Sequence, residues 1–329
     1  MKIVVPFYPL YVSTEKEDYF KICADVTGGE IIAVNRVNII TLIRNIIGQN
    51  VHGHGRGFPF PQLSCFFGKK SVYTFHNNFI GQRWYAKILR RFIFNHYTAI
   101  IVHSEYAKNN YIKQGIKPEK IKILPNPIDY NYFSNPKGGS KFRMKFGLKK
   151  GEPIALTVGT SYFKNPDIII KACNLVGIKL VIVGFIDKRE TRKYPGVIPS
   201  GKIFLNSNNV ILTGRLSKEE LLSAYDSATV YINSSDSDGE NFGISVYEAA
   251  AAGVPLCLPD YGTFDIFNGC ALFHNNHNPE QLALNIEKYL NNKELCKTNS
   301  EKAKKIASQF DYSIVRSQFE QFYKEIGII

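Results

Sequence analysis

Two glutamates in the second half of the chain are the clearest candidates for ligand chemistry. Glu240 lies in the polar stretch SSDSDGENFG, and Glu248 follows in ISVYEAAAAG, which has the composition of a helix. A loop that ends in Asn241, Phe242 and Gly243 presents the free N–H groups of the helix start, a natural seat for a diphosphate. The two carboxylates could accept hydrogen bonds from sugar and ribose hydroxyls. The segment therefore predicts a site for a ligand with a diphosphate and neutral hydroxyl groups.

Short β-rich runs that alternate with helix-length stretches predict the elements that position this site. Strands are predicted at residues 2–12, 30–35, 71–76, 99–104, 153–159, 178–184, 209–214, 228–234 and 254–259. This alternation is typical of α/β folds with parallel sheets. Ligands of such sheets bind at the carboxyl ends of the strands, which is where the chemistry should be sought.

One stretch between the two series of strands marks a domain boundary. Residues 126–141 contain Pro136 and a Gly-Gly pair, and they break both the strand and the helix periodicity. We therefore predict two Rossmann-like α/β domains, residues 1–135 and 136–310, that face each other across a cleft. The apolar spacing near the end of the chain predicts a terminal helix at about 311–329.

Length and composition agree with two soluble domains. The 329 residues are 44% hydrophobic, enough for two full cores, and no uncharged apolar run reaches the ~18 residues of a membrane span. Residues 1–12 are interpreted as a strand rather than a cleaved leader. The six cysteines form no CxxC pair, and no histidine stands at zinc-ligand spacing, which favours free thiols in a reducing compartment. We expect an unprocessed cytoplasmic protein.

The positive charge is concentrated in the first half. The net charge is +13, and residues 1–135 contain 17 Lys/Arg against 8 Asp/Glu. Within this half, residues 83–94 predict a basic amphipathic helix, with Lys87 and Arg91 among its cations and Trp84 at its start. Such a helix could lie on the anionic inner face of a membrane, or it could be an ordinary solvated surface helix. Nucleic acid is not an expected partner, because no known nucleic-acid-binding pattern accompanies the charge.

Four segments of the sequence resemble the retaining nucleotide-sugar glycosyltransferases of GT-B fold, glycosyltransferase family 4. They are residues 100–133, 157–172, 212–235 and 234–259. The resemblance implies that the first domain binds an acceptor and that the second binds a nucleotide sugar. It also implies that the terminal helix crosses back onto the first domain.

The same resemblance assigns roles at the donor. It implies that Glu240 holds the donor sugar and that Glu248 binds the ribose. The backbone of Phe242, Gly243 and Ile244 would contact sugar and phosphate. The donor is a substrate, and no cofactor is implied.

Cations and a histidine complete the implied site. Lys164 matches the family lysine on the diphosphate, where a fixed cation would stabilise the charge of the leaving phosphate without a metal. His76 matches the histidine near the transferred sugar. Gly159 is expected at the phosphates, but Thr160 follows it where the family usually has arginine. Arg215 is the candidate substitute.

Two other patterns suggest metal ligands. Asp236-Ser237-Asp238 reads as a DxD motif, but its position directly before Glu240 argues against a metal there. The stretch HGHGRG offers His52 and His54, which we interpret as part of a loop at the edge of the cleft, because prolines follow where a helix would be needed. No metal is therefore expected.

The function that follows is metal-independent sugar transfer to a glycan, a lipid-linked acceptor or a small molecule, with retention of configuration. Two alternatives stay open. One is a sugar-nucleotide hydrolase or epimerase of the same fold, which would turn over without an acceptor. The other is a protein that binds nucleotide sugar with little or no transfer activity.

Overall fold

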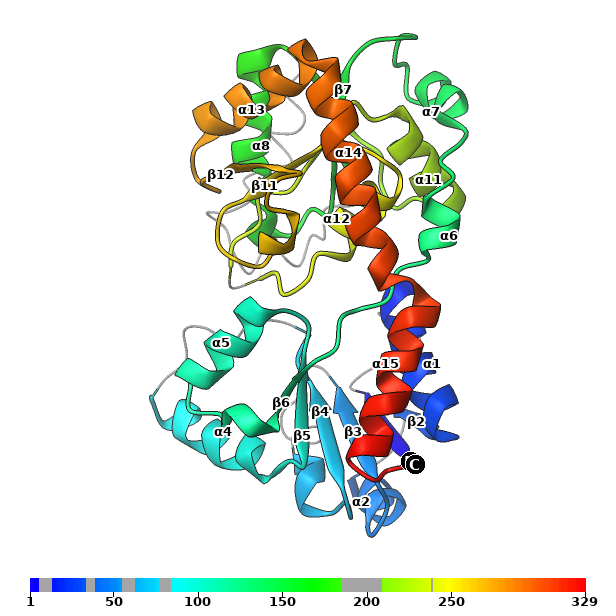
Figure 1. Cartoon of the computed structure of the whole chain (residues 1–329), viewed down its shortest axis with the longest axis vertical. Helices are drawn as coiled ribbons and strands as arrows, with labels where there is room; N and C mark the ends of the chain where they lie inside the picture. Colours follow the sequence, from blue (N-terminus) through cyan, green and yellow to red (C-terminus); the bar gives the residue numbers. More distant parts are fainter. Residues whose placement is uncertain (6–13, 34–38, 55–62, 77–83, 185–208, 238) are drawn as a thin grey trace. The chain divides into compact units, whose positions relative to one another are not determined.

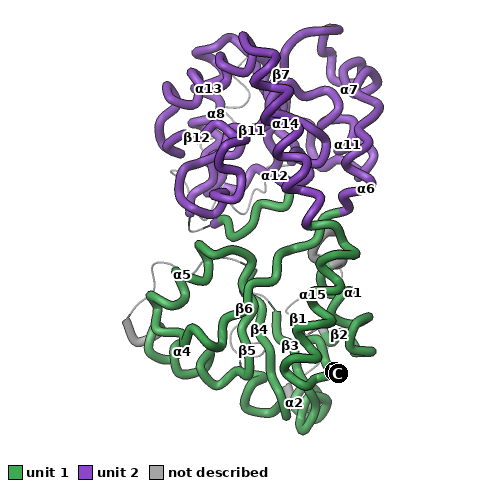
Figure 2. Tube along the Cα trace, viewed as in Figure 1, with its two compact units in different colours: residues 1–128, 240–244, 310–329 green, residues 129–239, 245–309 purple. Residues whose placement is uncertain are grey.

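The computed structural model describes residues 1–5, 14–33, 39–54, 63–76, 84–184, 209–237 and 239–329 (Figure 1). The chain divides into two compact units (Figure 2). Unit 1 contains residues 1–128, 240–244 and 310–329, and unit 2 contains residues 129–239 and 245–309. Each unit is described by itself below.

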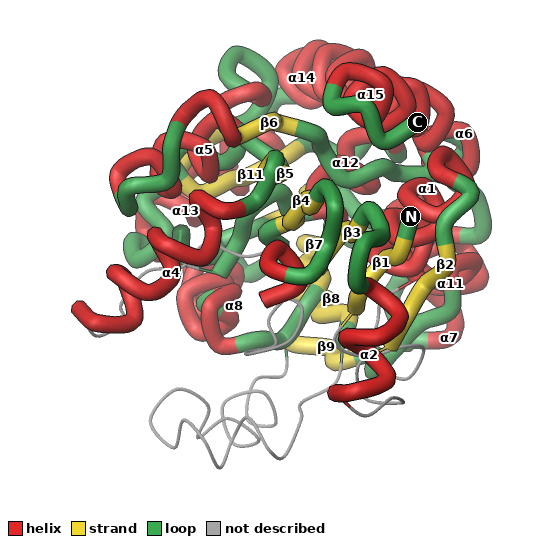
Figure 3. Tube along the Cα trace, turned by 90° about the horizontal axis from the view of Figure 1, so that it is seen from below, coloured by secondary structure: helices red, strands yellow, loops and turns green. Residues whose placement is uncertain are grey.

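The described part of unit 1 is built on a six-stranded parallel sheet with the order β2-β1-β3-β4-β5-β6. The strands are β1 (Lys2–Val5), β2 (Glu30–Ala33), β3 (Val51–His54), β4 (Ser71–Thr74), β5 (Ala99–Val102) and β6 (Ile121–Ile123). The helices are α1 (Thr14–Thr27), α2 (Ile39–Ile46), α4 (Trp84–His96), α5 (Glu105–Lys113) and α15 (Tyr312–Glu325). Figures 1 and 3 show α4 and α5 on one side of the sheet and α1 and α15 on the other.

The terminal helix is part of the core of unit 1. The rings of Phe319 in α15 and Tyr19 in α1 meet edge to face, with their centroids 5.0 Å apart. Phe322 and Tyr323 are buried in the same cluster as Ile3 of β1. The prediction that the chain ends in a helix that returns to the first domain is therefore confirmed.

Unit 2 repeats this architecture, and its described strands have the order β12-β11-β10-β7-β8-β9. The strands are β7 (Ile154–Val158), β8 (Lys179–Val183), β9 (Val210–Leu212), β10 (Val230–Ile232), β11 (Leu256–Pro259) and β12 (Leu272–His274). The helices are α6 (Tyr130–Phe133), α7 (Gly139–Lys145), α8 (Pro166–Val176), α11 (Lys218–Ser227), α12 (Ile244–Ala251), α13 (Pro279–Asn291) and α14 (Lys293–Ala307). Ile169 of α8 and Ile286 of α13 pack against the sheet in one buried cluster.

The predicted α/β class with two Rossmann-like sheets is confirmed. Residues 126–141, predicted to separate the two domains, contain α6 and the start of α7. One local interpretation was wrong. His52 and His54 do not lie in a loop but in β3, where both are buried. Sequence reasoning missed this strand because VHGH lacks the run of branched apolar residues that marks a buried parallel strand.

The packing of α15 yields a stability prediction. We expect Phe319→Ala to lower the free energy of unfolding by about 3–5 kcal/mol, because the fully buried ring would leave a cavity beside Tyr19. Ile314→Ala is the matched control in the same helix, since Ile314 is 44% exposed and should cost little. Denaturant unfolding of both variants measures the difference. Equal losses would mean that α15 does not complete the core of unit 1.

Candidate functional site

Three histidines follow one another along the carboxyl edge of the sheet in unit 1. His54 ends β3, His76 lies two residues after β4, and His103 directly follows β5. Their strands are neighbours in the sheet, so parallel pairing brings the side chains together. Nδ1 of His54 lies 3.4 Å from Nε2 of His76, and Nδ1 of His76 lies 3.4 Å from Nε2 of His103. The edge thus carries a chain of long histidine–histidine hydrogen bonds.

The far end of this chain fixes the tautomers of its members. Nδ1 of His103 lies 2.9 Å from the carbonyl oxygen of Leu124, which can only accept, so Nδ1 must carry the proton. With neutral rings, Nε2 of His103 then accepts from Nδ1 of His76, and Nε2 of His76 accepts from Nδ1 of His54. This series of hydrogen bonds ends at Nε2 of His54, a buried atom with no hydrogen-bond partner among the described residues.

This arrangement limits what His76 can do. Both of its ring nitrogens face other histidines, whereas the sequence predicts that it contacts a sugar. A hydrogen bond from His76 to a ligand would therefore replace one of these two interactions. Phe242 lies close by, with its ring centroid 6.4 Å from that of His103 and 5.5 Å from that of Phe310.

Among the described residues, one group of side chains could supply three metal ligands, and it includes a fourth histidine, His52. Ligand atoms of Cys23, His52 and His54 lie within 4.8 Å of one another. Both nitrogens of His52 are already engaged, since Nδ1 lies 2.6 Å from the hydroxyl of Tyr323 and Nε2 lies 2.7 Å from that of Thr74. Burial raises the pKa of the Cys23 thiol to about 12, so it stays protonated. These contacts favour a hydrogen-bonded core over a metal centre.

Burial keeps two of the histidines uncharged. It lowers the pKa of His52 to about 3. The pKa of His54 is held well below its ordinary value, first by burial and then by His52, His76 and His103. His52 and His54 are therefore neutral imidazoles, which can donate or accept a hydrogen bond without adding positive charge.

The corresponding edge of unit 2 carries three glycines instead. Gly159 follows β7, Gly184 follows β8, and Gly214 lies just beyond β9. Their φ angles are 103°, 138° and 75°, a region that favours glycine. The N–H of Gly184 donates to the carbonyl of Gly214 at 3.0 Å. The result is a rim of glycine backbone on three neighbouring strands, which has open space at Gly214 where a Cβ would lie.

Two cations adjoin this rim. A Cβ added at Gly159 would lie 3.2 Å from Cε of Lys164, so the glycine leaves room for the lysine side chain. Arg215 directly follows Gly214 and is exposed. Thr160 packs its methyl group over Gly184, 3.0 Å from an added Cβ. The predicted pair of cations thus lies along one edge of the sheet, at the ends of β7 and β9.

Asn165 fixes the loop that carries Lys164. It is the one non-glycine residue with a positive φ, 47°, in the part of the chain that the structure describes. Its amide donates to the carbonyl of Ser234 at 2.9 Å and to Oδ1 of Asp236 at 2.8 Å. The N–H of Asp236 in turn donates to the carbonyl of Phe163 at 2.7 Å. The loops after β7 and β10 are therefore locked together beside the cation.

These contacts also involve the first aspartate of the DxD motif. Oδ1 of Asp236 accepts from Asn165 and, at 2.7 Å, from the amide of Asn276, and it lies 3.3 Å from Nε2 of His277. Asp238 lies outside the described residues. The carboxylate of Asp236 therefore joins the loops after β7, β10 and β12.

Glu248 is buried in the second turn of α12. Its Oε2 accepts from the hydroxyl of Tyr225 at 2.8 Å. Tyr231 donates to Oγ of Ser245 in the first turn of the same helix, also at 2.8 Å. The tyrosines of α11 and β10 therefore hold the start of α12 and orient the carboxylate. Sequence reasoning identified Glu248 but missed both tyrosines.

The loop before α12 contains a second unusual side chain. Asn241 is buried, and neither its amide nitrogen nor its amide oxygen has a partner among the described residues. A buried amide without partners is costly, which makes it a candidate to bind a polar ligand. Glu240 precedes it and is partly exposed, Gly243 has a φ of 75°, and α12 begins at Ile244.

Comparison with known families decides what these features belong to. Residues 140–306 match the family Glycosyl transferases group 1, and residues 40–132 match Glycosyltransferase Family 4. The chain belongs to the group 1 glycosyltransferases. The match of this family covers the glycine rim, Lys164, Arg215 and both glutamates.

A relative with a described activity is distant in sequence. D-rhamnosyltransferase WbpZ of Pseudomonas aeruginosa is 25% identical over 214 residues, which span 63% of this chain and 54% of that protein. The match therefore covers little more than half of that relative.

Solved structures show the GT-B fold. Anabaena HepE in complex with UDP and glucose superposes with a TM-score of 0.80 over 98% of this chain and 99% of HepE, at 15% identity. A glycosyltransferase from Rickettsia africae gives 0.75 over 99% and 98%, at 18% identity. The predicted GT-B fold and family are confirmed.

The buried histidines generate a prediction about pH. The folded-state pKa of His52 is about 3 against an ordinary 6.5, so between these values only the unfolded chain takes up the proton. The stability is full above about pH 6.5 and should fall by up to about 1.4 kcal/mol per pH unit below it. Denaturant unfolding at pH 7.5 and 5.0 measures this loss. His52→Gln should flatten the dependence, whereas the exposed control His96→Gln should not; equal slopes in all three proteins would contradict the argument.

Proposed function

We propose that this chain transfers a sugar from a nucleotide diphosphate sugar to an acceptor, with retention of configuration and without a metal ion. The observation that carries the proposal is the rim of Gly159, Gly184 and Gly214 with Lys164 and Arg215 beside it. Bare backbone at the carboxyl ends of parallel strands suits a diphosphate. Fixed cations at that place suit the negative charge that grows on it.

The chemistry can be written with these residues alone. The bond between the anomeric carbon and the diphosphate oxygen breaks, and the acceptor oxygen bonds to the same carbon. The acceptor proton passes to the leaving phosphate, so no enzyme base is required. Lys164 and Arg215 stabilise the leaving group, as one well-placed charge or donor commonly contributes about 10²–10³ in rate. Retention is the expectation for this family, and a front-face route of this kind is consistent with it.

The remaining candidates bind the donor. Glu240 would hold the sugar hydroxyls, and Glu248, already oriented by Tyr225, would accept from the ribose. The unpartnered amide of Asn241 supports a polar ligand at this loop. His76 would steady the transferred sugar, with His103 keeping its tautomer fixed.

UDP-sugars are the donors to test first, because HepE is described with UDP, UDP-glucose and glucose. We expect a panel of nucleotide diphosphates and their sugars to raise the melting temperature for one base class, equally with and without chelator, since a ligand of the native state stabilises it. Lys164→Ala and Glu240→Ala should lose most turnover while remaining folded, and Arg215→Ala should also slow transfer. Lys171→Ala, an exposed lysine of α8, is the matched control.

Each contrary result has a distinct meaning. Normal turnover in Lys164→Ala or Glu240→Ala would discard the site, and unaffected turnover in Arg215→Ala would discard that residue as the missing cation. Nucleotide release without any acceptor would establish a hydrolase or epimerase. Binding without release for every acceptor would establish the binding protein, a function that Thr160 in place of the family arginine would explain.

We further propose that α4 places the protein on the cytoplasmic face of an anionic membrane. No helix in the described ranges is long and apolar enough to cross a bilayer. Ile88 and Phe92 lie one turn apart on α4 and are 61% and 57% exposed. Lys87 and Arg91 form the neighbouring row of the same helix. Exposed apolar and basic rows side by side suit an interfacial helix, and the six free cysteines suit a reducing compartment.

The membrane proposal predicts the effect of removing the apolar row. Ile88→Ser with Phe92→Ser should weaken sedimentation with anionic vesicles by about tenfold, because two apolar contacts with the bilayer are lost. Leu175→Ser with Leu284→Ser is the matched control, since these side chains are 61% and 58% exposed on α8 and α13. Binding that is insensitive both to the α4 change and to salt would remove the proposal.

A further inference from the structure

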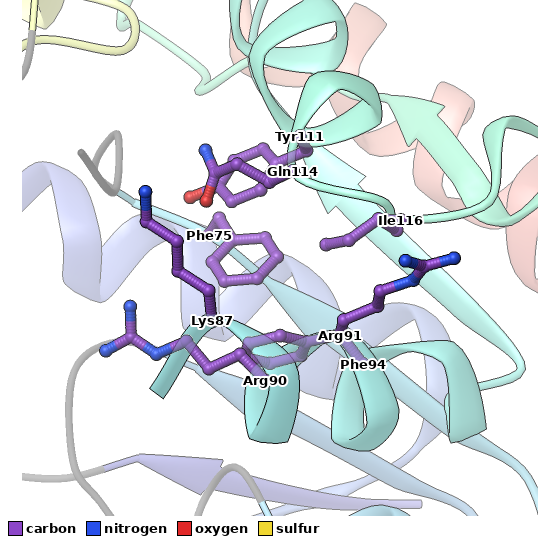
Figure 4. A pocket seen from close by; sticks show the side chains of 8 residues that line it. All are labelled: Phe75, Lys87, Arg90, Arg91, Phe94, Tyr111, Gln114 and Ile116. Carbon is purple, nitrogen blue, oxygen red and sulfur yellow. The ribbon is translucent and has the colours of Figure 1, made fainter. Parts of the chain in front are cut away.

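A shallow pocket that opens to solvent lies between α4 and α5 in unit 1 (Figure 4). The residues that line it are Phe75, Lys87, Arg90, Arg91, Phe94, Tyr111, Gln114 and Ile116. Three of these described residues are cationic and none is acidic. A pocket with this lining is suited to an anion.

The floor of the pocket is aromatic and firmly packed. The ring of Phe75 stacks on Tyr111 at 4.0 Å and meets Phe94 edge to face at 4.6 Å. All three side chains are buried. In Figure 4 the ring of Phe75 lies in the middle, with Lys87 and Arg90 on one side and Arg91 on the other. Low-polarity rings below the cations strengthen their attraction for an anion.

The walls are held in place by backbone contacts. The amide of Asn95 donates to the carbonyl of Gly115 at 3.0 Å and accepts from the N–H of Lys117 at 3.0 Å, which ties α4 to the turn after α5. The stem of Arg91 lies directly on this turn, because a Cβ added at Gly115 would be 2.8 Å from its Cδ. The cation of Arg91 is therefore positioned by the fold.

We propose that this pocket binds the phosphate of an amphiphile, a phosphate monoester or diphosphate that carries an apolar chain. The planar guanidinium group of Arg90 matches phosphate oxygens, Lys87 adds a point charge on the same side of Phe75, and Arg91 supplies a further cation on the other side. The apolar chain would lie along Ile88 and Phe92, the exposed row that flanks these cations. Phe75 directly precedes His76, so the pocket adjoins the histidine chain of the same unit. This assignment rests on the proposed transfer activity. The lipid phosphate would belong either to the acceptor or to the membrane on which the protein lies.

The test measures binding of decyl phosphate below its micelle concentration by calorimetry, with no nucleotide sugar present. Lys87→Gln with Arg91→Gln should weaken binding by about tenfold or more, because two charge-assisted contacts are lost. Lys297→Gln with Lys305→Gln removes the same charge from exposed positions of α14 and should leave binding unchanged. Gln114→Glu, which places a carboxylate in the lining, should also weaken binding.

Competition then distinguishes the two sources of the ligand. Displacement of decyl phosphate by vesicles of phosphatidylcholine and phosphatidic acid would assign a membrane lipid. Displacement by monomeric farnesyl phosphate, with vesicles inactive, would assign a lipid-linked acceptor. Either result supports the pocket. Equal affinity of the wild type and the Lys87/Arg91 variant, or equal affinity for decanol and decyl phosphate, would overturn it. Because no transfer is measured, the pocket and the proposed activity can fail independently.

Discussion

Parallel pairing of strands is the constraint on which both candidate sites depend. It brings every carboxyl end of a sheet to one edge, so residues far apart in sequence become neighbours whenever each follows a strand. In unit 1 this edge collects His54, His76 and His103. In unit 2 it collects Gly159 and Gly184. The same backbone geometry thus supports a cluster of side chains in one sheet and a lining of bare backbone in the other.

Burial then decides which chemistry each edge can perform. The histidines of unit 1 are packed beneath Tyr19, whose ring lies 5.3–5.6 Å from those of His54, His76 and His103. Such surroundings disfavour a charged imidazole. Lys164 and Arg215 in unit 2 are not enclosed in this way, since Arg215 is exposed and Lys164 is partly exposed. The edge of unit 1 therefore offers imidazole rings, whereas the edge of unit 2 offers two basic side chains.

The sequence predicted the fold more completely than the site. Buried parallel strands such as IALTV and KLVIV are continuous apolar runs, which are visible without any structure. β3 was missed because Gly53 and two histidines interrupt its apolar pattern. β6 and β12 were missed because a polar residue, Lys122 or His274, shortens the apolar run of each. Glu240, Glu248 and Lys164 could be singled out by residue type and family resemblance. The direction of the hydrogen bonds between the histidines could not be predicted, because the tautomers depend on the carbonyl of Leu124. This carbonyl meets His103 only in the folded sheet. A clue was present nonetheless, since VHGH, SVYTFH and AIIVHS each place a histidine at or just after a strand end.

The return of α15 to unit 1 has a consequence for synthesis of the chain on the ribosome. Residues 129–309 contain all of unit 2, so this unit can fold as soon as it has emerged. Unit 1 begins first but must wait for its last helix, because Tyr19 and Phe20 of α1 share a core cluster with Phe319 and Tyr323. Until residue 325 has been added, Tyr19 and Phe20 lack their contacts with α15, although their contacts within unit 1 can already form. Unit 1 is therefore completed only after the segment that contains unit 2 has been made.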